Sequence, residues 1–109
     1  MKMRSCIGAL VIAAASLAAP SVEAQDIMAG ERIAKIWCSG CHQVDNRAPK
    51  TGSDAVPSFP SVAQMNSTTA MSLMAFLSTS HGRMPDYALS RIELQNVSAY
   101  ILSLRKPPQ

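Results

Sequence analysis

Cys38-Ser39-Gly40-Cys41-His42 is the stretch of sequence that says most about the fold. Two thiols three residues apart, at the end of a helix, can each form a thioether with one of the two vinyl groups of a porphyrin. His42 then lies under the ring and can give a nitrogen to the iron, while Ser39 and Gly40 are small enough to let the backbone pass close to it. The C-x-x-C-H pattern is the attachment signature of a c-type haem. We therefore predict one covalently attached haem c with its iron, held by Cys38, Cys41 and His42.

Three other chemistries use cysteines at this spacing. A thioredoxin-like redox pair also has a tryptophan before the motif, here Trp37, but that fold needs a β-strand at this place, and a helical pattern precedes the motif instead. A zinc site could add His42 and His81 to the two thiols. The adjacent residues Cys41 and His42 would reach one tetrahedral ion only with difficulty. A disulfide between Cys38 and Cys41 would close too short a loop to stabilise the fold much.

The opposite face of the iron needs a second ligand, and Met84 is the candidate. It lies in a loop directly before Pro85, which fixes the chain direction. His81, three residues earlier, is the rival ligand, and an open site is the third possibility. A thioether favours ferrous iron, so ligation by His42 and Met84 would raise the reduction potential, whereas two histidines would lower it. Three other methionines, Met65, Met71 and Met74, lie in or next to helical segments, where we expect them to fill gaps in the core.

Residues 1–24 have the pattern of a secretory signal peptide. Two basic residues near the start are followed by a run of 13 apolar or small residues, from 7 to 19. That run is shorter than the ~20 residues that span a bilayer. We predict cleavage after Ala24, which leaves residues 25–109 as one domain; the alternative is an uncleaved anchor helix. Secretion agrees with the motif, because c-type haems are attached outside the cytoplasm.

Composition limits the classes of protein that the chain could represent. It has 109 residues, with 10 Lys and Arg against 7 Asp and Glu, for a formal net charge of +3. This length suits one small domain and is too little for separate substrate and cofactor lobes. The charges are interspersed and form no basic stripe, which argues against nucleic-acid binding. A body this small can draw much of its core from a prosthetic group.

Helical periodicity predicts an all-α body, with three to four helices and long loops. The first helix is expected from a cap at Asp26 to about Trp37, and Gly30 inside it suggests that another backbone packs closely there. The expected order continues with a loop over 45–60, a helix from about 67 to 77, a loop over 78–89, and a last helix from a Ser90–Glu93 capping box to Pro107-Pro108. Loops of this length in so small a domain usually wrap a ligand.

Four features together resemble the small class I c-type cytochromes, and the resemblance covers the whole of residues 25–109. They are Gly30, eight residues before Cys38; the C-x-x-C-H motif; Pro57-Ser58-Phe59, which is similar to a Pro-x-Leu segment; and the stretch 97–101 in the last helix. The resemblance implies the cytochrome c fold around one haem. It also implies that the Pro57 carbonyl accepts the ring N–H of His42, and that Gly30 packs against Tyr100.

The chain also departs from the family pattern. Ala34 stands where the family often has an aromatic residue, and we expect Trp37 to fill that volume. With 41 residues between His42 and Met84, the haem would be covered by the shorter, bacterial kind of loop.

The resemblance implies a periplasmic monohaem carrier of single electrons between a dehydrogenase or reductase and a terminal acceptor. With both axial positions occupied, the iron would have no place for a substrate, so we expect no enzyme activity, no catalytic residue and no small-molecule substrate. The expected partners are redox proteins, with no nucleic acid, and the expected state is a monomer. The alternative is a dedicated haem subunit or partner of one oxidoreductase complex. A haem enzyme or gas binder would require that Met84 is not bound to the iron.

Overall fold

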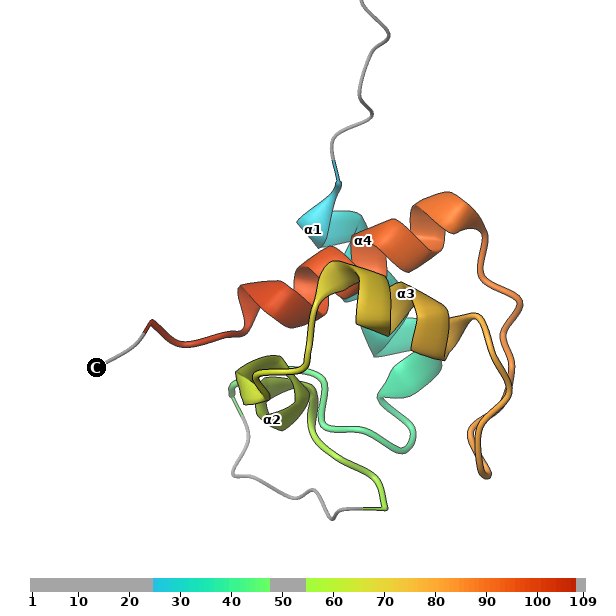
Figure 1. Cartoon of the computed structure of the whole chain (residues 1–109), viewed down its shortest axis with the longest axis horizontal. Coiled ribbons are helices and arrows are strands. Elements are labelled where there is room, and N and C mark those ends of the chain that lie inside the picture. The colour runs from blue at the N-terminus through green and yellow to red at the C-terminus, as the bar shows by residue number, and fades with distance from the viewer. Residues whose placement is uncertain (1–24, 48–54, 108–109) are drawn as a thin grey trace, which may run out of the picture.

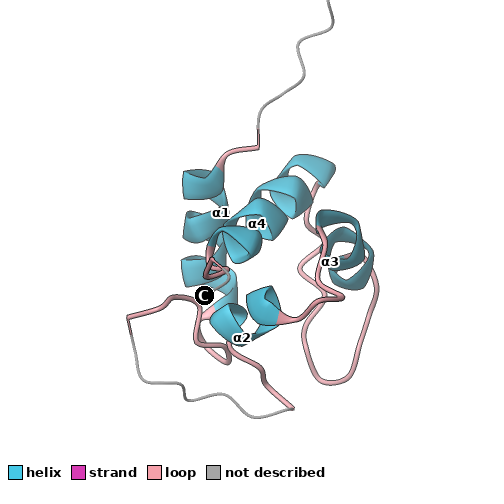
Figure 2. Cartoon of the chain, turned by 60° about the vertical axis from the view of Figure 1, so that its left-hand side comes forward, coloured by secondary structure: helices cyan, strands magenta, loops and turns pink. Residues whose placement is uncertain are grey.

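A computed structural model describes residues 25–47 and 55–107, and within these ranges the regular structure is helical (Figure 2). The elements are α1 (Ile27–Ile33), the π-helical turn η1 (Ala34–Cys38), α2 (Phe59–Gln64), α3 (Ala70–Leu77) and α4 (Arg91–Ser103). Neither range contains a β-strand. The predicted all-α fold is therefore confirmed. The predicted signal peptide, residues 1–24, lies outside the described residues.

Helices α1 and α4 cross in direct backbone contact (Figure 1). A Cβ atom on Gly30 would lie 2.0 Å from the carbonyl oxygen of Asn96 and 2.8 Å from the Cβ of Tyr100. The cap of α1 strengthens this crossing, because Asp26 accepts a hydrogen bond from Ala29 and donates its own N–H to the Asn96 side chain, both at 2.9 Å. The predicted packing of Gly30 against Tyr100 is confirmed, although the nearest atoms belong to Asn96.

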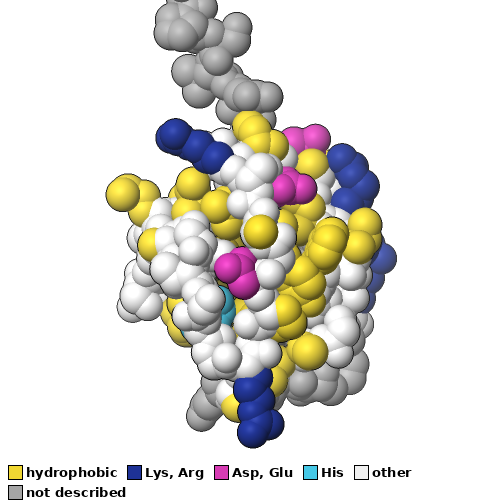
Figure 3. All heavy atoms as spheres, turned by 90° about the vertical axis from the view of Figure 1, so that its right-hand side faces the viewer, with side chains coloured by type: hydrophobic (Ala, Val, Ile, Leu, Met, Phe, Trp, Pro, Cys, Tyr) yellow, Lys and Arg dark blue, Asp and Glu magenta, His cyan; other side chains and the backbone are white. Residues whose placement is uncertain are grey.

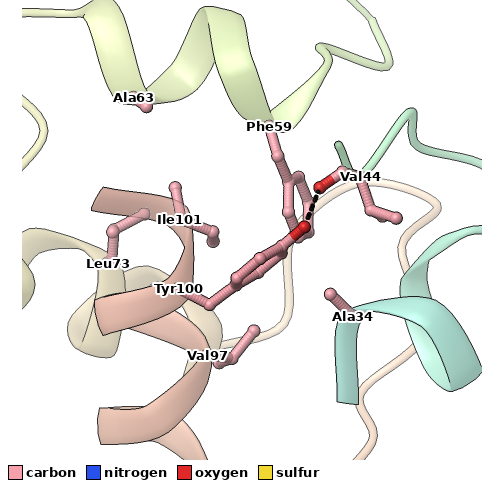
Figure 4. Packing of buried hydrophobic residues seen from close by; sticks show 8 residues of the cluster. All are labelled: Ala34, Val44, Phe59, Ala63, Leu73, Val97, Tyr100 and Ile101. Atoms are coloured by element: carbon pink, nitrogen blue, oxygen red, sulfur yellow. Dashed lines mark hydrogen bonds between the residues drawn. The ribbon is translucent and has the colours of Figure 1, made fainter. Parts of the chain in front are cut away.

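A small apolar core lies between η1, α2, α3 and α4 (Figure 4), and Ile33 of α1 packs against it. Its buried members are Ala34, Val44, Phe59, Ala63, Leu73, Val97, Tyr100 and Ile101. The Tyr100 side chain reaches across this core. Its hydroxyl donates a hydrogen bond of 2.8 Å to the carbonyl of Val44, just after the cysteine motif. The core thus links the last helix to the segment that carries the motif.

Helix α2 begins inside the segment that we expected to be an irregular loop up to Pro60. Ser58 caps it by accepting from the Ser61 N–H at 3.2 Å, and Pro60 lies in its first turn, where a missing N–H costs no hydrogen bond. The helix has only six residues, which is too short for a recognisable apolar period. Its other end is fixed by Arg105, which donates to the Ala63 carbonyl at 2.6 Å from beyond α4.

The starts of the other helices follow the local capping signals. Helix α4 has the predicted capping box, in which Ser90 accepts from the Glu93 N–H and Glu93 accepts from the Ser90 N–H. Helix α3 has a second capping box, from Thr69 and Ser72, so it begins a few residues later than the expected start near 67. The predicted loop over 78–89 is confirmed, and α4 ends at Ser103, before the proline pair.

Two methionines do not have the core role that we expected. Met65 is 48 % exposed and Met71 is 82 % exposed, so neither fills a gap in the core. Helix α3 is apolar around most of its circumference, and only the face with Leu73 turns inward. Helical spacing therefore predicted the helix but not which of its apolar residues lie inside. Within the described residues, no helix is long and apolar enough to cross a membrane.

Candidate haem-binding site

A cavity of about 290 Å³ lies between the cysteine motif and the loop that precedes α4. All five predicted site residues line it: Cys38, Cys41, His42, Pro57 and Met84. The rival ligand His81 lines it as well. The fold thus brings together two thiols, two imidazoles and a thioether from segments about forty residues apart.

The cysteine motif is a turn that follows directly on η1. The Ser39 N–H donates to the Ala34 carbonyl five residues back at 3.0 Å, and the Cys41 and His42 N–H groups then both donate to the Cys38 carbonyl, at 3.2 and 2.9 Å. The turn leaves Cys38 half-buried and Cys41 exposed, with both thiols free. A π-helical turn is often found at a functional site.

The environment of the cysteines does not favour the redox-pair interpretation. Burial raises the pKa of the Cys38 thiol above its usual value. Reactive cysteines of thioredoxin-like proteins have a lowered pKa instead, because a nearby positive charge or helix N-terminus stabilises the thiolate. A zinc site is also not supported, because no three His, Cys, Asp or Glu side chains in residues 25–47 and 55–107 lie close enough to hold a metal ion.

His42 is oriented by the backbone of the segment before α2. Its Nδ1 lies 2.7 Å from the carbonyl oxygen of Pro57, as the family resemblance implied. A carbonyl oxygen only accepts, so Nδ1 carries the proton and Nε2 keeps the lone pair that can bind a metal. The Phe59 N–H donates to the Gln43 carbonyl at 2.9 Å, which fixes the proline segment beside the motif.

The loop between α3 and α4 places His81 and Met84 side by side. The Met84 N–H donates to the His81 carbonyl at 3.3 Å, and the turn between them passes through Gly82, whose φ of +54° lies in the left-handed region that favours glycine. The His81 Nε2 then lies 3.0 Å from the Met84 Sδ. We expected these two residues to be rival ligands and did not predict their contact, although a turn across H-x-x-M with a glycine inside is a signal for it.

Aromatic side chains form one edge of the cavity. We expected Trp37 to fill the volume beside Ala34, but it does not. Its side chain is 47 % exposed and meets Tyr87 edge to face, with ring centroids 4.9 Å apart. Phe76, at the end of α3, also lines the cavity. Tyr87 and Phe76 were missed because they belong to no motif. The combination of an apolar lining, two thiols, an imidazole and a thioether is a donor set that fits haem c.

Comparison with known proteins gives two matches. The family described as "Cytochrome C oxidase, cbb3-type, subunit III" matches residues 25–101. The chain is also similar to cytochrome c-552 of Bradyrhizobium diazoefficiens (strain JCM 10833 / BCRC 13528 / IAM 13628 / NBRC 14792 / USDA 110), at 43 % identity over 96 residues, which cover 88 % of this chain and 90 % of that protein. No solved structure matches the chain at a significant level.

Proposed function

Because the chain belongs to the c-type cytochromes, a family of electron-transfer proteins with covalently bound haem c, we propose that it is a periplasmic monohaem carrier. It takes single electrons from a dehydrogenase or reductase and passes them to a terminal acceptor. Its partners are redox proteins, and it acts as a monomer. Electron carriers of this family are generally not enzymes, and the proposal includes no catalytic residue.

Five residues hold the haem in this proposal. Cys38 and Cys41 would form the two thioethers, His42 and Met84 would bind the iron, and Pro57 would orient the His42 ring. The observation that carries the proposal is the hydrogen bond of 2.7 Å from His42 to the Pro57 carbonyl, in a cavity that the other three residues also line. It leaves Nε2 as the only ring nitrogen of His42 with a free lone pair.

The chain's own side chains set the chemistry of the site. The haem supplies reversible one-electron transfer when bound. A soft thioether from Met84 favours the reduced state and raises the reduction potential. With His42 and Met84 both bound to the iron, no position would remain for a small molecule, and electrons would pass through an exposed edge of the site. Cys41 is exposed, which puts one edge of the site at the surface.

Covalent attachment is tested by the stability of the colour. The haem of the wild type should remain with the protein after acid–acetone extraction and on a denaturing gel, because thioethers survive both treatments. Cys38→Ser combined with Cys41→Ser should lose the covalent haem. Ser39→Ala should keep it, because within residues 25–47 and 55–107 the Ser39 side chain makes a single, exposed hydrogen bond, to the Lys35 carbonyl. A colourless wild type would overturn the proposal.

Secretion is tested by mass. The protein recovered from the periplasm should have the intact mass of residues 25–109 plus one haem, because we propose that residues 1–24 are a signal peptide cleaved after Ala24. Recovery of the full chain in the membrane fraction would favour the uncleaved anchor.

The second candidate function is a dedicated haem subunit or partner of one oxidoreductase, and one observation favours it. Large apolar side chains that do not line the cavity are exposed, among them Met71 on α3 and Ile36 on η1, and Figure 3 shows apolar side chains on one face of the molecule. A shuttle should sediment as a monomer in a native periplasmic extract at moderate salt. A dedicated subunit should instead sediment as part of a larger complex of fixed composition.

A further inference from the structure

Two contacts hold His81 in place, one with a backbone carbonyl and one with an aromatic ring. Its Nδ1 lies 2.8 Å from the carbonyl oxygen of Thr79, its ring lies over Phe76 with centroids 3.6 Å apart, and its Nε2 faces the Met84 sulfur at 3.0 Å. A solvated loop histidine would have no such fixed orientation. These contacts aim one particular nitrogen of the ring at the sulfur that the proposed function assigns to the iron.

The bond to Thr79 decides which nitrogen of the neutral ring carries the proton. A backbone carbonyl only accepts, so at 2.8 Å the Nδ1 must donate. The neutral ring then has its lone pair on Nε2, and this is the form of imidazole that binds metals. His42, which lines the same cavity, has the same arrangement, because its Nδ1 donates to the Pro57 carbonyl. Both histidines that line the cavity therefore have a carbonyl on Nδ1 and a lone pair on Nε2.

The two donor atoms on the Met84 side are close enough to serve one position. Metal–nitrogen and metal–sulfur bonds in proteins, for example those of zinc, are about 2.0–2.3 Å long. Atoms 3.0 Å apart can each reach a common point at these lengths. Exchange of one donor for the other then needs only small side-chain movements, and no unfolding of the turn that joins them.

We propose that His81 is a reserve axial ligand, which binds the iron through Nε2 whenever the Met84 sulfur leaves it. The inference rests on the proposed function, because it requires a haem held by Cys38 and Cys41. In the intact protein Met84 is the ligand, and His81 competes with external small ligands for the position that Met84 vacates. The iron thus keeps a protein ligand on both faces, although the potential falls when a second imidazole replaces the thioether.

The test compares four holoproteins: wild type, His81→Ala, Met84→Ala and Met84→Ala/His81→Ala. Wild type and His81→Ala should both show the weak long-wavelength band of an iron–thioether bond. Met84→Ala should lose the band but keep a low-spin ferric spectrum, with a lower reduction potential. The double variant should turn high-spin and bind carbon monoxide at least ~10-fold more tightly than Met84→Ala, the factor expected if His81 occupies the iron in about 90 % of the molecules.

A second double variant, Met84→Ala/His81→Phe, keeps an aromatic ring beside Phe76 and removes only the nitrogens. It should behave like the alanine pair, and helix content by circular dichroism checks that each variant is folded. A high-spin Met84→Ala protein, with the same affinity for carbon monoxide as either double variant, would overturn the inference and leave the proposed function intact. If His81→Ala alone abolished the long-wavelength band, or bound carbon monoxide readily, the ligand assignment in the proposed function would itself be wrong.

Discussion

Gly30 is the residue at which the two terminal helices touch. Replacing it with alanine puts a Cβ atom 2.0 Å from a backbone oxygen of α4, and a backbone atom cannot turn aside as a flexible side chain can. Gly30→Ala should therefore lower the free energy of unfolding by about 1–3 kcal/mol, the usual range for overpacking. Urea unfolding followed by circular dichroism measures this change.

Met28→Ala is the control for that prediction, because it also places an alanine in α1. The Met28 side chain is 61 % exposed, so its truncation should leave the unfolding midpoint nearly unchanged. Equal losses in the two variants would show that the close approach of α1 and α4 is not what requires glycine at position 30.

Tyr100 contributes both a hydrogen bond and a pH dependence. Tyr100→Phe leaves the Val44 carbonyl without the buried hydroxyl and should cost about 1–2 kcal/mol at pH 7. Burial, and next the carboxylates of Glu31 and Asp45, raise the pKa of Tyr100 above 10.0. The folded state therefore favours the neutral phenol, so this contribution to stability is complete below about pH 10 and is lost as the pH rises through the pKa of the folded state.

The measurement is urea unfolding at pH 7 and at a series of pH values above 10. The wild type should lose stability in the alkaline range more steeply than Tyr100→Phe. Tyr87→Phe is the control, because the structure gives the Tyr87 hydroxyl no hydrogen bond within the described residues. A Tyr87→Phe protein with the same alkaline behaviour as Tyr100→Phe would contradict the assignment.

At the scale of the elements, the capping box at the start of α4 carries a titratable group. The backbone N–H of Ser90, and then its side chain, lower the pKa of Glu93 below 4.5. A carboxyl with a lowered pKa stabilises the folded state above the pKa of the unfolded chain, and this contribution is lost as the pH falls through the folded pKa. Glu93→Gln should therefore unfold at a lower temperature than wild type at pH 7, and at nearly the same temperature at pH 3.

Ser90→Ala separates the hydroxyl from the carboxylate in the same cap. It removes the acceptor for the Glu93 N–H and should cost about 1 kcal/mol, because an N-cap serine satisfies a donor that the helix cannot. Part of that loss should persist at pH 3, where the carboxylate no longer contributes. Thermal melting of both variants at the two pH values distinguishes the two parts of the cap.

At the scale of the whole molecule, Arg105 joins the end of the chain to α2 and the turn after it. Its guanidinium donates to the carbonyls of Ala63 at 2.6 Å and Thr68 at 2.8 Å. Hydrogen bonds from a charged donor are worth about 1.5–3 kcal/mol, so Arg105→Ala should lower stability by a similar amount. Arg105→Lys should recover only part of it, because an ammonium cannot reproduce the planar fork.

Lys106→Ala is the control for the loss of charge. Lys106 is exposed and of the same sign, so its removal should change the urea midpoint little. If Lys106→Ala and Arg105→Ala were equally destabilised, net charge rather than the link to α2 would account for the effect.

The sequence alone sufficed for those features whose cause lies within a few residues. The caps at Asp26 and Ser90 depend on side chains that accept hydrogen bonds from backbone N–H groups only three residues away. These two residue types therefore predict where α1 and α4 begin. The haem motif is also local, because the distance between two thioethers sets the spacing of its cysteines. Gly30 could be assigned a close packing partner because a helix interior without a Cβ otherwise loses stability.

Only the tertiary structure decided the features that depend on contacts between distant segments. Helix α2 is six residues long and is held partly by Arg105, some forty residues away. Its apolar residues therefore show no helical period from which it could be predicted. Met71 is apolar and lies in α3, yet its side chain faces outward, because burial depends on which neighbours a residue meets and not on the residue itself. The contact of His81 with Met84 needed the turn at Gly82 as well as the anchor at Thr79, and each of these is a property of the folded loop. A local hydrogen bond depends on residues that are close together in the sequence, so the sequence predicts it. A long-range contact depends on how two distant segments pack, which the sequence does not show directly.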